Sequence, residues 1–83
     1  MNPAEWLLNT AKASPEAPAL FHGTEEVASY GEFARRAAAI AGALAQRGIG
    51  PGDRVAILMH NRTEYLEAMY GIWWAGAAAV PIN

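Results

Sequence analysis

Apolar residues follow two different periods along this chain. Between Ser29 and Gly48 they recur every three or four positions, which places them on one face of a helix: Phe33, Ala37, Ile40, Ala41 and Leu44. Short apolar runs bounded by turn residues indicate strands at residues 19–22, 54–59 and 77–82. Residues 26–29 can pair with the first run as a hairpin across a turn at Gly23-Thr24. The pattern predicts a chain that mixes helices with short strands.

Start and stop signals define three helices. Each begins with a capping residue followed three positions later by glutamate: Asn2 with Glu5, Ser29 with Glu32, and Asn61 with Glu64. The first helix is expected to stop before Ser14-Pro15, because the residue ahead of a proline avoids the helical conformation. Gly48 and Gly76 end the second and third helices, since glycine takes the left-handed conformation without a Cβ clash.

The second half of the chain predicts a parallel βαβ unit. Strand 54–59, the third helix and strand 77–82 follow one another with short connections, and such a unit is expected to be right-handed. Parallel strands are covered on both faces in a mature sheet, and residues 72–74 make the third helix apolar all round. We therefore expect residues 1–83 to be a single partial domain, the N-terminal part of a larger α/β domain with a short hairpin and one βαβ unit.

Composition limits the core that this chain can build by itself. Apolar residues make up 53% of the 83 residues, but nineteen are Ala, and Leu, Ile, Val and Phe together number sixteen. Burial contributes about 25 cal/mol per Å² and ordering costs about 1.5 kcal/mol per residue, so a chain of this size comes out near zero. The sequence has no Cys, and hence no disulfide. We expect the remainder of the domain, or another copy of the chain, to cover the apolar surface.

The charge distribution argues against two classes of partner. Six basic and eight acidic residues give a net charge of −2 without long runs, which leaves no footprint for nucleic acid or an anionic membrane. The first five residues lack the positive charge of a signal peptide. The uncharged run 68–82 is shorter than the roughly 18 apolar residues of a membrane span. The expectation is a cytoplasmic protein with no transmembrane segment.

A glycine-rich stretch and two histidines are the first candidates for chemistry. Phosphate-binding loops follow a strand and open a helix, whereas Gly48–Gly52 follows a helix and opens a strand, which favours a cap and a turn. His22 and His60 lie 38 positions apart without a metal-ligand pattern. His60 follows strand 54–59 at its carboxyl end, where ligands bind in open α/β sheets. A pocket role and a hydrogen-bonded structural role both stay open for His60.

Two further pairs have structural explanations. Glu64 and Glu67 share a helical face, but Glu64 fits a cap and Glu67 is expected to be a solvated surface charge. Trp73-Trp74 can pack in a core or line an apolar cavity, and core packing is the default. The local patterns therefore assign no catalytic, cofactor-binding or metal-binding residue.

The order and spacing of the motifs resemble a known family. They run as Ala19-Leu20, Ser29-Tyr30-Gly31-Glu32-Phe33, Ala41-Gly42-Ala43-Leu44, Gly48-Ile49, Pro51-Gly52-Asp53-Arg54-Val55-Ala56-Ile57, Asn61 with Glu64-Tyr65, Gly71-Ile72-Trp73 and Ala75-Gly76-Ala77 to Val80-Pro81-Ile82-Asn83. This succession resembles the start of the adenylate-forming superfamily of acyl-CoA synthetases, luciferases and peptide-synthetase adenylation domains. The ending at Asn83 is most similar to acyl- or aryl-CoA synthetases.

The resemblance implies an N-terminal structural segment of a ligase that uses ATP, Mg²⁺ and CoA. In that family a fatty or aromatic carboxylate attacks the α-phosphate of ATP to give an acyl-adenylate, and the CoA thiol then displaces AMP. The family's phosphate-loop and lid lysines have no match here, because the only Lys, Lys12, lies outside the matching region. The resemblance therefore implies that this chain alone is inactive and binds none of these cofactors.

Two alternatives stay open beside this interpretation. A self-contained binding or oligomerisation module would unfold cooperatively. A segment of a larger domain would instead expose an apolar edge around Val80 and Trp73-Trp74. The second alternative is a segment of a peptide-synthetase adenylation domain, whose parent would activate amino acids.

Overall fold

The computed structural model describes residues 2–58 and 63–82 of the chain. The elements run in the order α1 (Pro3–Ala13), β1 (Pro18–His22), β2 (Glu25–Ser29), α2 (Tyr30–Gln46), β3 (Arg54–Ile57), α3 (Thr63–Trp74) and β4 (Ala78–Pro81). All the predicted helices and strands are present. The predicted strand 54–59 is shorter than expected, because Leu58 lies outside β3 and Met59 lies outside the described residues.

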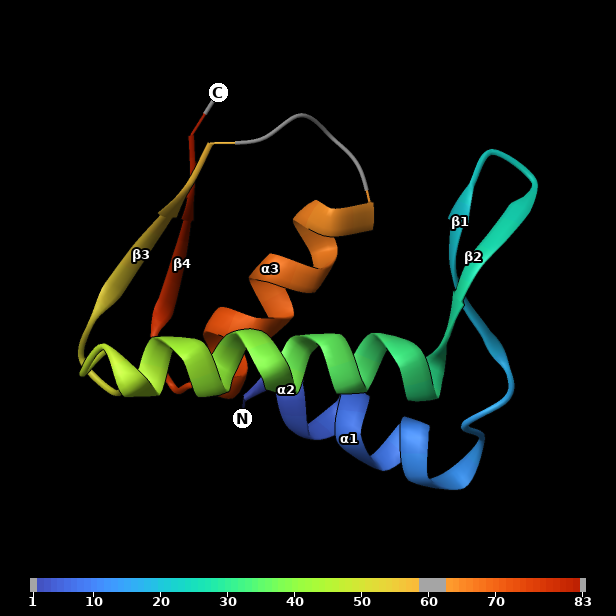
Figure 1. The fold of residues 1–83 in the computed structure, drawn as a ribbon, viewed down its shortest axis with the longest axis horizontal. Helices are drawn as coiled ribbons and strands as arrows, with labels where there is room; N and C mark the ends of the chain where they lie inside the picture. Colours follow the sequence, from blue (N-terminus) through green and yellow to red (C-terminus); the bar gives the residue numbers. More distant parts are fainter. Residues whose placement is uncertain (1, 59–62, 83) are drawn as a thin grey trace.

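Helix α2 runs along the long axis of the molecule and connects two separate strand pairs (Figure 1). The antiparallel hairpin β1–β2 stands at one end of α2, and the parallel pair β3–β4 stands at the other (Figure 1). Helices α1 and α3 both pack against α2 and against each other. The fold is therefore a helical layer with a short strand pair at each end, and this confirms the predicted hairpin and βαβ unit.

The first residues of the chain are tied to the end of α3. Asn2 caps α1, and its Oδ1 atom accepts a hydrogen bond of 3.0 Å from the backbone N–H of Ala4. The sequence pattern predicts a capping box, in which the Asn2 side chain would accept a hydrogen bond from the N–H of Glu5. In the structure the donor is instead Ala4, one residue before Glu5. The Asn2 Nδ2 atom donates a hydrogen bond to the backbone carbonyl oxygen of Trp73. One side chain thus links the start of α1 to the last turn of α3.

Helix α2 has the capping box that the sequence predicts. The Ser29 hydroxyl accepts a hydrogen bond of 3.2 Å from the Glu32 N–H, and the Glu32 carboxylate accepts one of 2.9 Å from the Ser29 N–H. The bond from the Ser29 N–H is the main cause that lowers the pKa of Glu32, because it is strongest with the ionised carboxylate. The box fixes the point at which the hairpin gives way to the helix.

Both α2 and α3 end in the same glycine motif. Gly48 has φ +77° and Gly76 has φ +85°, as expected for left-handed residues that follow a helix. The next residues, Ile49 and Ala77, donate backbone hydrogen bonds of 3.0 and 3.1 Å to the carbonyl oxygens of Leu44 and Ile72. These hydrogen bonds pair the N–H of the residue after each glycine with a carbonyl oxygen of the last helical turn, and so end the helix. The predicted ends of both helices are confirmed.

The two glycine turns lie against each other at the base of the βαβ unit. A Cβ atom on Gly76 would lie 3.1 Å from the Cγ of Pro51, which belongs to the turn ahead of β3. Strands β3 and β4 begin next to this contact. They form a parallel pair in which Arg54 lies opposite Ala78 and Ile57 opposite Pro81. The inner face of the pair packs on α3 through Ile57, Ile72 and Ala77.

Helices α2 and α3 approach closely at Gly71. A Cβ atom at this position would lie 2.6 Å from the Cβ and Cγ2 of Ile40 and 3.1 Å from the carbonyl oxygen of Ala37. Beside this contact lies the larger core cluster, whose members come from α1, the hairpin and α2: Leu7, Ala11, Leu20, Ala28, Phe33, Ala34 and Ala37. The absence of a side chain at Gly71 therefore sets the distance between the two helices that carry the fold.

Gly71→Ala should destabilise the chain although alanine favours helices. The added methyl must displace Ile40, and overpacking of this kind costs about 1–3 kcal/mol against a helix-propensity gain of about 1 kcal/mol. The matched control is Gly42→Ala on the exposed side of α2, where nothing lies within 4 Å of the added Cβ. Urea unfolding should show a lower midpoint for Gly71→Ala and a raised midpoint for Gly42→Ala. A raised midpoint for both variants would contradict the close approach.

The lowered pKa of Glu32 gives a direction for pH dependence. A carboxyl group with a lower pKa in the folded state stabilises the fold above its unfolded pKa, and this contribution is lost as the pH falls through the folded value. A carboxyl ¹³C titration of Glu32 should therefore give a midpoint below the ordinary value of 4.5. A midpoint at or above that value would show that the capping box does not hold the ionised group.

Candidate functional site

A charged cleft among the described residues holds several candidate groups. It has a volume of about 490 Å³ and lies where the hairpin faces the first turns of α3. Its lining residues come from four elements and are mostly polar: His22, Glu25, Val27, Arg36, Thr63, Glu64 and Glu67. The cleft brings His22 together with the pair Glu64 and Glu67, to which no sequence pattern connects it.

Glu67 is not the solvated surface charge that the sequence pattern predicts. Its carboxylate accepts a hydrogen bond of 2.9 Å from Arg36 Nη1, and its side chain is only 12% exposed, whereas that of Arg36 is 46% exposed. The pair crosses from α3 to α2, and residues 31 positions apart give no local sequence signal. The hydrogen bond and charge of Glu67 raise the pKa of Arg36, with smaller contributions from Glu32 and Glu64.

Glu64 lies in the first turn of α3, where its negative charge interacts favourably with the positive end of the helix dipole. Its carboxylate accepts a hydrogen bond of 3.2 Å from the Thr63 hydroxyl. The predicted cap at Asn61 lies outside the described residues, as does His60. The position of Glu64 fits a role in starting the helix.

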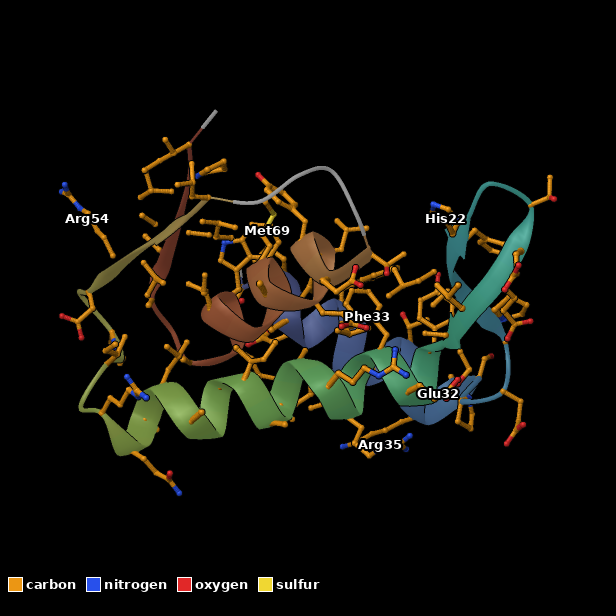
Figure 2. All side chains as sticks on the ribbon, turned by 45° about the horizontal axis from the view of Figure 1, so that its top comes forward. His22, Glu32, Phe33, Arg35, Arg54 and Met69 are labelled. Carbon is orange, nitrogen blue, oxygen red and sulfur yellow. The ribbon has the colours of Figure 1, made fainter. Side chains whose placement is uncertain are left out.

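His22 lies at the end of β1 on the exposed surface of the hairpin, at the opposite end of the molecule from Arg54 (Figure 2). Within residues 2–58 and 63–82 no three His, Asp or Glu side chains are grouped so that they could hold a metal ion. The cleft therefore lies between the hairpin and two helices that the Arg36–Glu67 ion pair joins, and its described residues do not make a metal centre.

Three amides of the glycine-rich turn, residues 48–52, donate hydrogen bonds within the chain. The Gly48 and Ile49 N–H groups donate to carbonyl oxygens at the end of α2. The Gly50 N–H donates to the Asp53 carboxylate at 2.8 Å, and the Asp53 N–H donates back to the Gly50 carbonyl at 3.0 Å. A phosphate-binding loop needs N–H groups that point at the ligand. These residues therefore do not fit nucleotide phosphates, in agreement with the cap-and-turn interpretation.

The remaining candidates occupy structural positions. Trp73 meets Tyr70 edge-to-face at 5.0 Å, and Trp74 packs against the larger core cluster, so core packing accounts for both half-buried rings. Lys12 is exposed in the last turn of α1. No described helix is long and apolar enough to cross a membrane. The expected apolar edge is present at Val80, which is exposed, whereas the two tryptophans are partly covered.

Comparison with known proteins identifies the family. The model of the AMP-binding enzyme family matches residues 7–83, which is nearly the whole chain. The chain therefore belongs to the AMP-binding enzyme family, and it is an N-terminal segment of an adenylate-forming enzyme. This agrees with the resemblance seen in its motifs.

Three relatives illustrate the range within the family. The chain is 42% identical over 78 residues to feruloyl-CoA synthase of Amycolatopsis, covering 94% of this chain and 16% of that protein. It is 44% identical over 72 residues to a linear gramicidin synthase of Brevibacillus parabrevis, covering 87% of this chain and 1% of that protein. The structure of Mycobacterium tuberculosis fatty acyl CoA synthetase superimposes with a TM-score of 0.88 at 37% identity, covering 99% of this chain and 16% of that one.

The salt bridge between Arg36 on α2 and Glu67 on α3 should make a small, salt-dependent contribution to the stability of the fold. Because Arg36 is half exposed, we expect Arg36→Gln to cost about 0.5–1 kcal/mol at low salt and less at about 1 M salt. Arg35→Gln, at the exposed neighbouring arginine, is the control and should shift stability by less than about 0.5 kcal/mol. Thermal unfolding at two salt concentrations measures both. Equal, salt-independent effects would show that the Glu67 contact adds nothing.

Proposed function

We propose that this chain is the structural N-terminal segment of an ATP-dependent, AMP-forming acyl-CoA ligase. The observation that carries this proposal is the agreement in fold and sequence with fatty acyl CoA synthetase over 99% of the chain. The identity of 42% to feruloyl-CoA synthase supports the same class of reaction. The parent enzyme would convert a fatty or aromatic acid, ATP and CoA into an acyl-CoA thioester, AMP and pyrophosphate.

The role of residues 1–83 in this enzyme is to support the fold. Three of their glycine-turn amides donate hydrogen bonds within the chain, and the described residues provide no metal-binding group. Holding a triphosphate needs backbone amides, cationic side chains and a metal ion directed at the charge. ATP, Mg²⁺ and CoA would therefore be bound by other parts of the parent, and the 83-residue chain by itself would be inactive.

A peptide-synthetase adenylation domain is the second candidate for the parent. The identity of 44% to the linear gramicidin synthase favours it. The two candidates differ in substrate and in acceptor, since the second would activate an amino acid and would not form a free CoA thioester. The contacts within the described residues favour neither parent over the other.

The test is to read the gene beyond the codon for Asn83, express the complete open reading frame, and assay it. We expect ATP–pyrophosphate exchange and CoA-thioester formation with fatty or aromatic acids, and neither reaction with residues 1–83 alone.

Exchange with amino acids and no CoA thioester would replace the acyl-CoA ligase by the peptide-synthetase alternative. A stop codon directly after Asn83, with no adenylating activity, would contradict both and favour a self-contained module.

A further inference from the structure

The hairpin end of the molecule carries most of its negative charge. In addition to the charged cleft, a second hollow of about 370 Å³ lies where the hairpin meets the start of α2, and Ser29, Glu32 and Arg35 are among its lining residues. The two hollows are lined by six of the eight acidic residues of the chain: Glu16, Glu25, Glu26, Glu32, Glu64 and Glu67. With histidine neutral, these six carboxylates and the guanidinium groups of Arg35 and Arg36 leave a formal charge of −4, whereas the whole chain carries −2.

Three of these carboxylates accept hydrogen bonds within the chain, as described above. The other three are exposed, and no hydrogen bond or ion pair among the described residues engages their side chains: Glu16, Glu25 and Glu26. Glu25 lines the cleft, and its neighbour Glu26 lines the second hollow. A concentration of like charge of this kind attracts a cationic partner and repels an anionic one.

A notch lined mainly by apolar residues adjoins the charged cleft. It has a volume of about 330 Å³, lies between residues 19–23 of the hairpin and the first turns of α3, and shares His22 and Thr63 with the cleft. Two large apolar side chains at the notch are open to water, since Phe21 is 50% and Leu66 41% exposed. Strand β1 pairs only with β2 among the described strands, so one of its edges can accept an extended segment. We call the notch and the cleft together the docking groove.

We infer that the docking groove binds a basic, extended segment of another protein, in which an apolar side chain lies close to a lysine or arginine. The apolar side chain occupies the notch beside Leu66, and the cation lies in the cleft beside Glu25. The shared lining residues place these two contacts next to each other. The negative charge of this end argues against nucleic acid and anionic lipid as the partner. A second copy of the chain would bring like carboxylates together in a symmetric contact. This inference goes beyond the proposed ligase activity and does not depend on it.

The test measures peptide binding to the complete protein, expressed from the open reading frame that contains residues 1–83. A fluorescein-labelled peptide of sequence Lys-Leu-Lys-Leu-Lys supplies both charge and apolar side chains, and fluorescence anisotropy reports its binding. We expect binding that weakens as the salt concentration rises from about 0.05 to about 0.5 M. The matched peptide Glu-Leu-Glu-Leu-Glu should not bind. The peptide Lys-Gly-Lys-Gly-Lys, which lacks the apolar side chains, should bind at least about fivefold more weakly.

Two pairs of variants locate the groove. Glu25→Gln should weaken binding about two- to fivefold at low salt, whereas Glu5→Gln, at an exposed carboxylate on α1, should leave it unchanged. Leu66→Ala should weaken binding about fivefold, whereas Ile82→Ala, which removes a similarly exposed side chain after β4, should not. If Leu66→Ala does not fold, the comparison of the two exposed glutamates still decides.

Equal effects of Glu25→Gln and Glu5→Gln would overturn the inference, as would equal binding of the basic and acidic peptides. Binding of Lys-Gly-Lys-Gly-Lys as tight as that of the leucine peptide would overturn the role of the notch. Binding to the 83-residue chain alone but not to the complete protein would show that the groove is closed in the parent, and would overturn the inference as well. The result is independent of whether the complete protein forms an acyl-CoA thioester.

Discussion

The close approach of α2 and α3 at Gly71 is the contact on which the other parts of this structure depend. Ile40 occupies the space that any side chain at position 71 would need. Each helix carries its own strands at its ends: the hairpin runs into α2, and β3 and β4 flank α3 in the chain. The distance between the two helices therefore also sets where the hairpin lies relative to the parallel pair. Small residues at this crossing, including Ala37, let the backbones meet without a thick layer of side chains.

The glycine turns show how the same residue types serve support or chemistry according to their place in the fold. At the carboxyl end of a helix, Gly48 and its neighbours direct their N–H groups back to the helix carbonyls, and Gly50 is bonded to Asp53. At the amino end of a helix, the same amides would be free for an anion. In this segment the hydrogen bonds of the turn fix the start of β3, and the contact of Pro51 with Gly76 fixes the start of β4 beside it. The two strands consequently leave the helices in register.

The sequence predicts most of this fold because its signals are local. Ser29 with Glu32, Gly48 and Gly76 act within one helical turn, and each is found where the pattern places it. The errors and omissions concern contacts between distant residues. Glu67 pairs with Arg36 on another helix, and Asn2 reaches Trp73, so neither partner is visible in the spacing of neighbouring residues. The cleft beside His22 is missed for the same reason, since four elements meet there. The exposed apolar edge at Val80 agrees with the expectation from the sequence, in which residues 55–59 and 77–82 are apolar throughout.

The hydrogen bond from Asn2 to Trp73 also has a consequence for synthesis on the ribosome. Its partners are 71 positions apart, and at about 5–20 residues per second roughly 4 to 14 seconds separate their translation. During that interval α1 can pack on the hairpin and α2, with which Leu7 shares the larger core cluster, but it has no α3 to dock on. The side of α1 that meets α3 in the finished fold therefore stays open until the last turn of α3 has been made.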